Sequence, residues 1–163
     1  MASISSSPNV SSKAVAEEFT AIVTNVMKRS STPMVEFVER YDLSFTQLKV
    51  MFALANNDEP LPIGRIAEIT GGSLPATGRA VDGLVRHGLT TRTEDPTDRR
   101  VKRVEVTDLG TTGMNEIFES RTATLSALLD GLSPDQLEAL GQALQPLRAL
   151  VENPANCETE VSR

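Results

Sequence analysis

The sequence predicts a mostly α-helical fold that contains one small β-hairpin. Apolar residues recur three or four positions apart along much of the chain, which is the spacing of one helix face. The first such stripe is Val15, Phe19, Ile22 and Val26. Two Ser-x-x-Gln sequences, each ahead of an apolar run, have the pattern of a capping box at a helix start. Two segments rich in β-branched residues flank a turn at Pro96–Thr97, as in a hairpin.

The first expected helix runs from Lys13 to about Ser30 and carries that stripe. Pro33 then stops or kinks the chain, with Thr32 as N-cap and Pro33 at the first helical position of a short second helix through Tyr41.

The middle of the chain predicts three helices followed by the hairpin. Ser44 starts a helix that ends at "NNDEPLP", and residues 63–70 form a short helix closed by Gly71–Gly72. Ser73 caps a further helix that ends at Gly88. The two hairpin strands are expected at 89–95 and 101–107.

Two longer helices complete the pattern. One runs from Thr107 to about Asp130, and the other restarts at Ser133 and Pro134, with a kink expected at Pro146. The last helix carries a coiled-coil-like seam of Leu137, Leu140, Leu144, Leu147 and Val151.

Composition excludes several classes of protein. With one cysteine, Cys157, and one histidine, His87, the chain cannot form an intrachain disulfide or supply the ligands of a structural zinc site. We expect no metal and no cofactor. The sequence shows no signal peptide and no membrane-length apolar run, so we expect a cytoplasmic protein with no membrane partner. Cys157 lies in a polar tail and is interpreted as a plain exposed thiol.

Charge is distributed unevenly. The net charge is −6, which argues against a nonspecific polyanion binder. Residues 63–106 nevertheless hold eight of the 16 Lys and Arg but only six of the 22 Asp and Glu. The basic charge is therefore concentrated on the predicted hairpin and the helix before it.

The two helices joined by "TGGS" form a candidate helix-turn-helix. The N-terminus of the second helix would direct N–H groups toward phosphate. Its first turns hold small or short side chains, which allow close approach to base edges in the major groove. The candidate contacts are Ser73, Leu74, Pro75, Thr77, Gly78 and, one to two turns in, Arg79.

A hairpin directly after such a helix is a wing. Its tip carries Arg99 and Arg100, followed by Lys102, and an arginine can enter the narrow minor groove of DNA. Asp98 lies two residues before Arg100 and could hold that guanidinium by a charge-assisted bond. The alternative is a solvated, charged surface hairpin.

The segment "DPTDRRVKRVEVTDLG" resembles the wing of the MarR family of winged helix-turn-helix bacterial transcriptional regulators. That pattern is D-x-R, an apolar alternation and then L/V-T-x-x-G, matched here by Asp98, Arg100, Val104, Val106, Thr107 and Gly110. The preceding helix resembles the family's recognition helix at Ser73, Thr77, Arg79, Val81, Asp82, Leu84, Gly88 and Leu89. The resemblance covers roughly Lys13 to Glu152. Gly78 and Gly83 depart from the family, which usually has Thr or Ser and a long side chain there.

The resemblance implies a homodimer, joined through the first and last two helices, on a pseudo-palindromic operator in double-stranded DNA. We expect a repressor released by a small aromatic or anionic effector, bound between the dimer helices and the winged unit. The candidate effector contacts are Met34, Phe37, Tyr41 and Phe52, although each could be plain core. The implied division is a tail over 1–12, a single domain over 13–152 and a tail over 153–163. Within the domain, 44–107 is the winged unit, and 13–41 and 108–152 are dimerisation helices.

Two other classes of function compete with this interpretation. For an enzyme, the sequence offers no Cys/His or Ser/His/Asp arrangement, no phosphate-binding glycine loop and no metal spacing. A winged-helix module for protein–protein contact alone would not need paired wing arginines or small residues at the start of the recognition helix.

Overall fold

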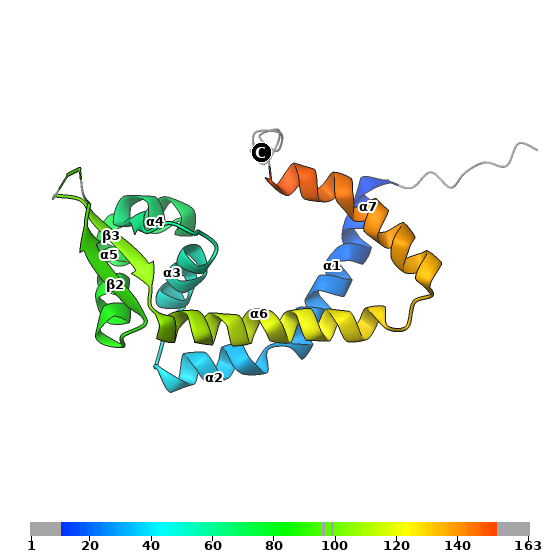
Figure 1. Cartoon of the computed structure of the whole chain (residues 1–163), viewed down its shortest axis with the longest axis horizontal. Coiled ribbons are helices and arrows are strands. Elements are labelled where there is room, and N and C mark those ends of the chain that lie inside the picture. The colour runs from blue at the N-terminus through cyan, green and yellow to red at the C-terminus, as the bar shows by residue number, and fades with distance from the viewer. Residues whose placement is uncertain (1–10, 96, 99, 153–163) are drawn as a thin grey trace, which may run out of the picture. The chain divides into compact units, whose positions relative to one another are not determined.

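The computed structural model describes residues 11–95, 97–98 and 100–152, and Figure 1 draws their helices and strands. The helices are α1 (Ser12–Arg29), α2 (Thr32–Arg40), α3 (Phe45–Ala55), α4 (Ile63–Thr70), α5 (Leu74–Arg86), α6 (Asp108–Leu129) and α7 (Pro134–Glu152). The strands are β1 (Leu61–Pro62), β2 (Thr90–Glu94) and β3 (Lys102–Val106). The predicted fold class, mostly helical with a small hairpin wing, is confirmed.

Two compact units divide the chain at Thr124, and each is described by itself. The first contains α1 to β3 and most of α6, and the second contains the end of α6 and all of α7. The expected tails lie outside the described residues except for Ser11 and Ser12, and so does Cys157. The division into a winged unit and dimerisation helices stays a prediction.

A three-stranded antiparallel sheet packs with α3, α4 and α5 in the first unit (Figure 1). Its central strand is β3, on which Val104 lies opposite Arg92 of β2 and Leu61 of β1. Sequence reasoning does not predict β1, because a two-residue strand ending in Pro62 has the composition of a loop. The buried core includes Val50, Met51, Leu54, Ile66, Val81, Leu84, Leu89, Val104, Met114 and Ile117.

The predicted capping boxes at α3 and α7 are both confirmed. The Ser44 N–H donates to Gln47 Oε1 at 2.8 Å, and the Gln47 N–H donates to Ser44 Oγ at 3.3 Å. Ser133 and Gln136 repeat this exchange at 2.9 and 3.3 Å. These side chains satisfy N–H groups that a helix start leaves unpaired.

The prediction for the start of α2 is wrong by one residue. Ser31 occupies the N-cap position, whereas Thr32 and Pro33 lie in the first turn. The Ser31 hydroxyl donates to the Lys28 carbonyl at the end of α1 and does not cap α2. The Ser31 side chain therefore caps the C-terminal end of α1 rather than the start of α2. A sequence search for N-cap residues does not consider that role.

Two glycines allow close contacts in the first unit, one on α5 and one at the start of α6. A Cβ on Gly83 would lie 2.3 Å from Gln47 Nε2, so glycine lets α5 approach α3. A Cβ on Gly110 would lie 2.3 Å from the Leu89 carbonyl oxygen. The Thr107 hydroxyl accepts the Gly110 N–H, so the T-x-x-G motif joins the wing to α6.

Both α1 and α7 expose apolar side chains. Of the large apolar residues of α1, only Val26 is buried, while Phe19 is 46% and Ile22 is 52% exposed. On α7 the exposed large apolar residues are Leu137, Leu140, Leu144, Leu147, Leu150 and Val151. A search of the described helices for a span long and apolar enough to cross a membrane finds none.

Candidate nucleic-acid interface

The N-terminal end of α5 is exposed and well capped. Ser73 Oγ accepts the N–H of Ala76 at 3.4 Å, and Pro75 occupies the first turn. Ser73, Leu74, Pro75 and Arg79 are exposed, and Gly78 is half-buried. The opposite face, through Ala80, Val81 and Leu84, packs into the core. The core therefore holds α5 in place while the first turns of the helix stay exposed to solvent.

Thr77 does not belong to this exposed surface. Its side chain is fully buried, and its hydroxyl has no hydrogen-bond partner among the described residues. A Cβ on Gly72 would lie 3.1 Å from Thr77 Oγ1, so the side chain packs under the turn between α4 and α5. A buried side chain cannot reach a groove unless the helix moves, so this burial does not favour a base contact by Thr77, and that contact stays a prediction.

Asp95 organises the turn of the wing. One carboxylate oxygen accepts the Thr97 N–H at 2.8 Å, the Thr97 hydroxyl and the Asp98 N–H at 3.2 Å, while the other accepts Arg103 Nε. These bonds, that from the Thr97 hydroxyl above all and then that from Arg103, hold the pKa of the Asp95 carboxyl well below its usual range. The charged carboxylate therefore favours the folded turn.

Asp98 contacts Arg100 in a different way from the one predicted. Its Oδ1 accepts the backbone N–H of Arg100 at 2.9 Å, as in an Asx turn, and does not hold the guanidinium. The Arg100 side chain is exposed and has no acidic partner among the described residues. Arg99 lies outside the described residues.

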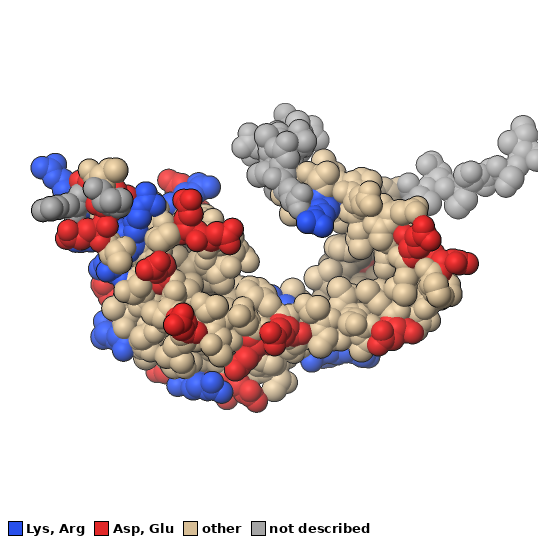
Figure 2. All heavy atoms as spheres, viewed as in Figure 1, with Lys and Arg blue, Asp and Glu red and all other residues tan. Residues whose placement is uncertain are grey.

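The other two basic residues of the hairpin are already paired. Lys102 Nζ lies 2.6 Å from Glu94 Oε1 across the strands. Arg103 binds Asp95 and also donates to the Pro60 carbonyl at 2.9 Å, which ties β3 to the segment before β1. Lys and Arg side chains gather with acidic ones at this end of the unit (Figure 2). Sequence reasoning missed the roles of Asp95 and Arg103.

Comparisons with known proteins bear on this arrangement of helix, turn, helix and wing. A model of the MarR family matches residues 41–101, from the end of α2 to the wing. The HTH-type transcriptional regulator YfiV of Bacillus subtilis is 32% identical over 114 residues, which cover 70% of this chain and 71% of YfiV. The chain belongs to the MarR family. It is thus a DNA-binding transcriptional regulator with a winged helix-turn-helix.

Two solved structures extend the likeness in fold. A transcriptional regulator of Thermotoga maritima superposes with a TM-score of 0.72 at 18% identity, over 91% of this chain and 99% of that one. A mutant of MepR from S. aureus, solved bound to an oligodeoxyribonucleotide, has a TM-score of 0.58 at 19% identity, over 84% and 97%. At such identities the likeness shows the fold alone.

A further contact of this MarR-family chain links the wing to the recognition helix. Arg92 of β2 lies 2.8 Å from Asp82 Oδ1 of α5. Asp82 is among the residues that match the family's recognition helix, but the sequence does not indicate its partner. The ion pair joins α5 to the wing hairpin.

The four predicted effector contacts lie in or against the core. Phe37 is buried, and Met34, Tyr41 and Phe52 pack against the core cluster. The Phe37 and Tyr41 rings are 5.2 Å apart, and Phe52 lies 6.0 Å from Phe118 of α6. None of the four lines the cavity of about 240 Å³ beside β3. Their role in effector binding stays a prediction.

Proposed function

We propose that the protein is a homodimeric repressor that binds a pseudo-palindromic operator and is released by a small-molecule effector. The observation that carries the DNA-binding part is the pairing of two exposed features: the capped first turns of α5 and the wing-tip Arg100, which has no acidic partner among the described residues.

In this proposal α5 enters the major groove and the wing follows the adjacent minor groove. Leu74, Pro75 and Gly78 allow close approach to base edges, and Arg79 reaches a guanine edge or a phosphate. Ser73 lies at the helix N-terminus, where N–H groups favour phosphate. The MepR mutant, which has this fold, was solved bound to an oligodeoxyribonucleotide, and this supports the DNA-binding part of the proposal.

On the wing, Arg100 is proposed to enter the minor groove, with Arg99 and Lys102 near phosphates. Asp98 acts through the backbone, because it holds the Arg100 N–H and so fixes the direction in which that side chain leaves the turn. Lys102 must break its ion pair with Glu94 before it can bind a phosphate, so it contributes less to the affinity for DNA than Arg100 does.

The dimer is proposed to form through residues 13–41 and 108–152. Soluble monomers rarely expose extended apolar surface, and the stripes of α1 and α7 are such surfaces. Light scattering should report about twice the chain mass for the full chain. A folded monomer at micromolar concentration would contradict this part.

The test of DNA binding is a titration against operator and scrambled DNA at several salt concentrations, with the operator taken from a selection of bound genomic fragments. Arg100→Ala should weaken operator binding by about 1–3 kcal/mol per half-site and reduce the salt slope by about 1 in each half-site. Arg40→Ala, an equal loss of charge on the exposed end of α2, is the matched control. Equal weakening in both variants would favour a winged-helix module that binds proteins rather than specific DNA.

A further inference from the structure

A groove of about 330 Å³ lies between the start of α3 and one face of α5 in the first unit. Arg79 and Arg86 line it from α5, about two turns apart on the same face of the helix. No Asp or Glu among the described residues lines this groove, so all the formal charges along it are positive. A groove of this kind attracts an anion.

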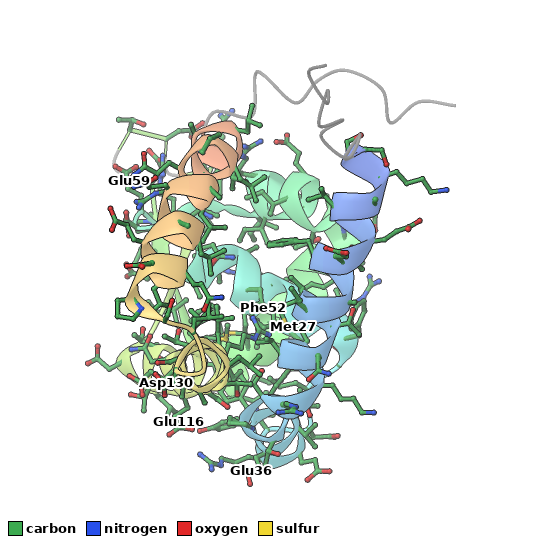
Figure 3. The ribbon with its side chains drawn as sticks, turned by 90° about the vertical axis from the view of Figure 1, so that its right-hand side faces the viewer. Met27, Glu36, Phe52, Glu59, Glu116 and Asp130 are labelled. Carbon is green, nitrogen blue, oxygen red and sulfur yellow. The ribbon has the colours of Figure 1, made fainter. Side chains whose placement is uncertain are left out.

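The two arginines of this groove are available to a ligand. Both are exposed, and neither has an ion-pair partner in the part of the chain that the structure describes. Figure 3 labels three acidic residues of the first unit, Glu36, Glu59 and Glu116, which belong to α2, the loop before β1 and α6. None of these three lines the groove.

Gln47 adds a hydrogen-bond donor whose direction is fixed. Its Oε1 accepts the Ser44 N–H and the Ser44 hydroxyl, each at 2.8 Å, in the capping box of α3. The Nε2 group must then point the other way, and it lies against the position that a Cβ on Gly83 would take. Arg86 Nη2 lies 3.7 Å from that same position. Because residue 83 is glycine, an amide N–H group and a guanidinium lie beside each other in the groove.

We propose that this groove binds a phosphate group of the operator backbone, with Arg86 and Gln47 as the contacts. The inference rests on the proposed function, because it adds a contact to the same docking of α5 on DNA. Guanidinium groups bind phosphate oxygens through strong charge-assisted hydrogen bonds, and an amide N–H adds a further one. Since the first turns of α5 would contact base edges, its last turn would lie nearer the backbone. The contact would position α5 without reading sequence.

The test is a titration of two variants against operator and scrambled DNA at several salt concentrations. Arg86→Ala should weaken binding of both DNAs by about three- to tenfold in each half-site and lower the salt slope by about 1. Gln47→Glu should weaken both by a similar factor, because glutamate keeps the capping box but replaces the donor with a charge that repels phosphate. The urea unfolding midpoint of Gln47→Glu should not fall, which separates a lost contact from a lost fold.

Each variant has a matched control. Gln136→Glu makes the same change in the capping box of α7 and lies outside the groove. Arg40→Ala removes the same charge as Arg86→Ala from a residue that does not line the groove. Arg40 is nevertheless near the end of α5, because the ring of its neighbour Tyr41 lies 6.4 Å from that of His87. Equal weakening by Arg40→Ala and Arg86→Ala would show a general effect of charge and overturn the proposal.

Two further measurements identify the source of the phosphate. Operator phosphates are replaced one at a time by neutral methylphosphonates. One position in each half-site should cost the wild type the same factor as Arg86→Ala and cost that variant nothing more. Calorimetric titration with inorganic phosphate examines the groove without DNA. If Gln47→Glu abolishes binding of inorganic phosphate while neither variant changes the affinity for DNA, the groove takes a free phosphate and the backbone contact is wrong.

The proposal is overturned if the variants change the binding of neither DNA nor inorganic phosphate. Failure of the proposed function has a different result, because the wild type would then bind operator no better than scrambled DNA. The affinities of the two variants and their controls for scrambled DNA would still decide the backbone contact, since a phosphate contact does not depend on sequence.

Discussion

Gly110→Ala should destabilise the protein by about 1–3 kcal/mol, the usual cost of forcing an extra methyl group into a packed site. The added Cβ would lie 2.3 Å from the Leu89 carbonyl oxygen and 2.6 Å from Val106 Cγ1. Leu89 is fully buried, and its carbonyl accepts the Thr107 N–H at 3.1 Å. Neither neighbour can withdraw without loosening the junction between the wing and α6.

Gly78→Ala is the matched control for this substitution. Gly78 is also helical, and a Cβ there would have no neighbour within 4 Å. Only the helix propensity of the residue changes, so alanine should stabilise the protein by up to about 1 kcal/mol. The two Gly→Ala substitutions should thus change the free energy of unfolding in opposite directions. The difference comes from the packing around each glycine, because the chemical change is the same.

The assay is urea unfolding followed by circular dichroism at a fixed protein concentration, because the stability of a dimer depends on concentration. The unfolding midpoint should fall for Gly110→Ala and stay level or rise for Gly78→Ala, with the denaturant slope unchanged. A Gly110→Ala protein as stable as the wild type would show that the wing and α6 adjust to the methyl group, and the reasoning from close contact would be refuted.

Three further outcomes are expected. The fold lowers the pKa of Asp95, so the carboxylate stabilises the protein fully above the unfolded pKa near 4. This stabilisation is lost as the pH falls toward the folded pKa. The free energy of unfolding of Asp95→Asn should therefore depend less on pH below about 5 than that of the wild type. A double-mutant cycle of Asp82→Asn and Arg92→Gln should give a coupling of about 0.2–1 kcal/mol, as for exposed ion pairs, and additive effects of the two changes would contradict the ion pair. Leu144→Asp should yield monomers by light scattering while Gln145→Asp, equally charged and next to it on α7, should not; a dimer in both would exclude that stripe from the interface.

The sequence predicts the elements well because their signals are local. The capping boxes at Ser44 and Ser133, and Gly88 at the end of α5, depend on residues at most four apart. β1 escapes prediction because only its pairing with β3, some 40 residues away, makes it a strand. Strand pairing of this kind is a tertiary property that a two-residue segment cannot encode.

At the candidate site, the burial of Thr77 and the Asx turn of Asp98 could have been predicted from the sequence. Thr77 precedes Ala80, Val81 and Leu84 by three, four and seven positions, so it lies on the buried stripe of α5. Thr77 was chosen as a DNA contact because its side chain is small and lies near the start of the helix, and that choice did not consider this periodicity. Asp98 lies two residues before the N–H that it accepts, which is the ordinary spacing of an Asx turn.

The partners of the basic residues of the hairpin could not be predicted from the sequence. "DRRVKR" gives four positive charges in a row of six residues, and nothing local distinguishes their partners. In the structure Lys102 is held by Glu94, and Arg103 by Asp95 and Pro60. Lys102 and Arg103 therefore stabilise the wing itself. Their charges are already paired with neighbouring carboxylates in the protein without DNA. A count of basic residues therefore overstates the charge that this hairpin offers to phosphate. The acidic residues around it determine which arginines remain available.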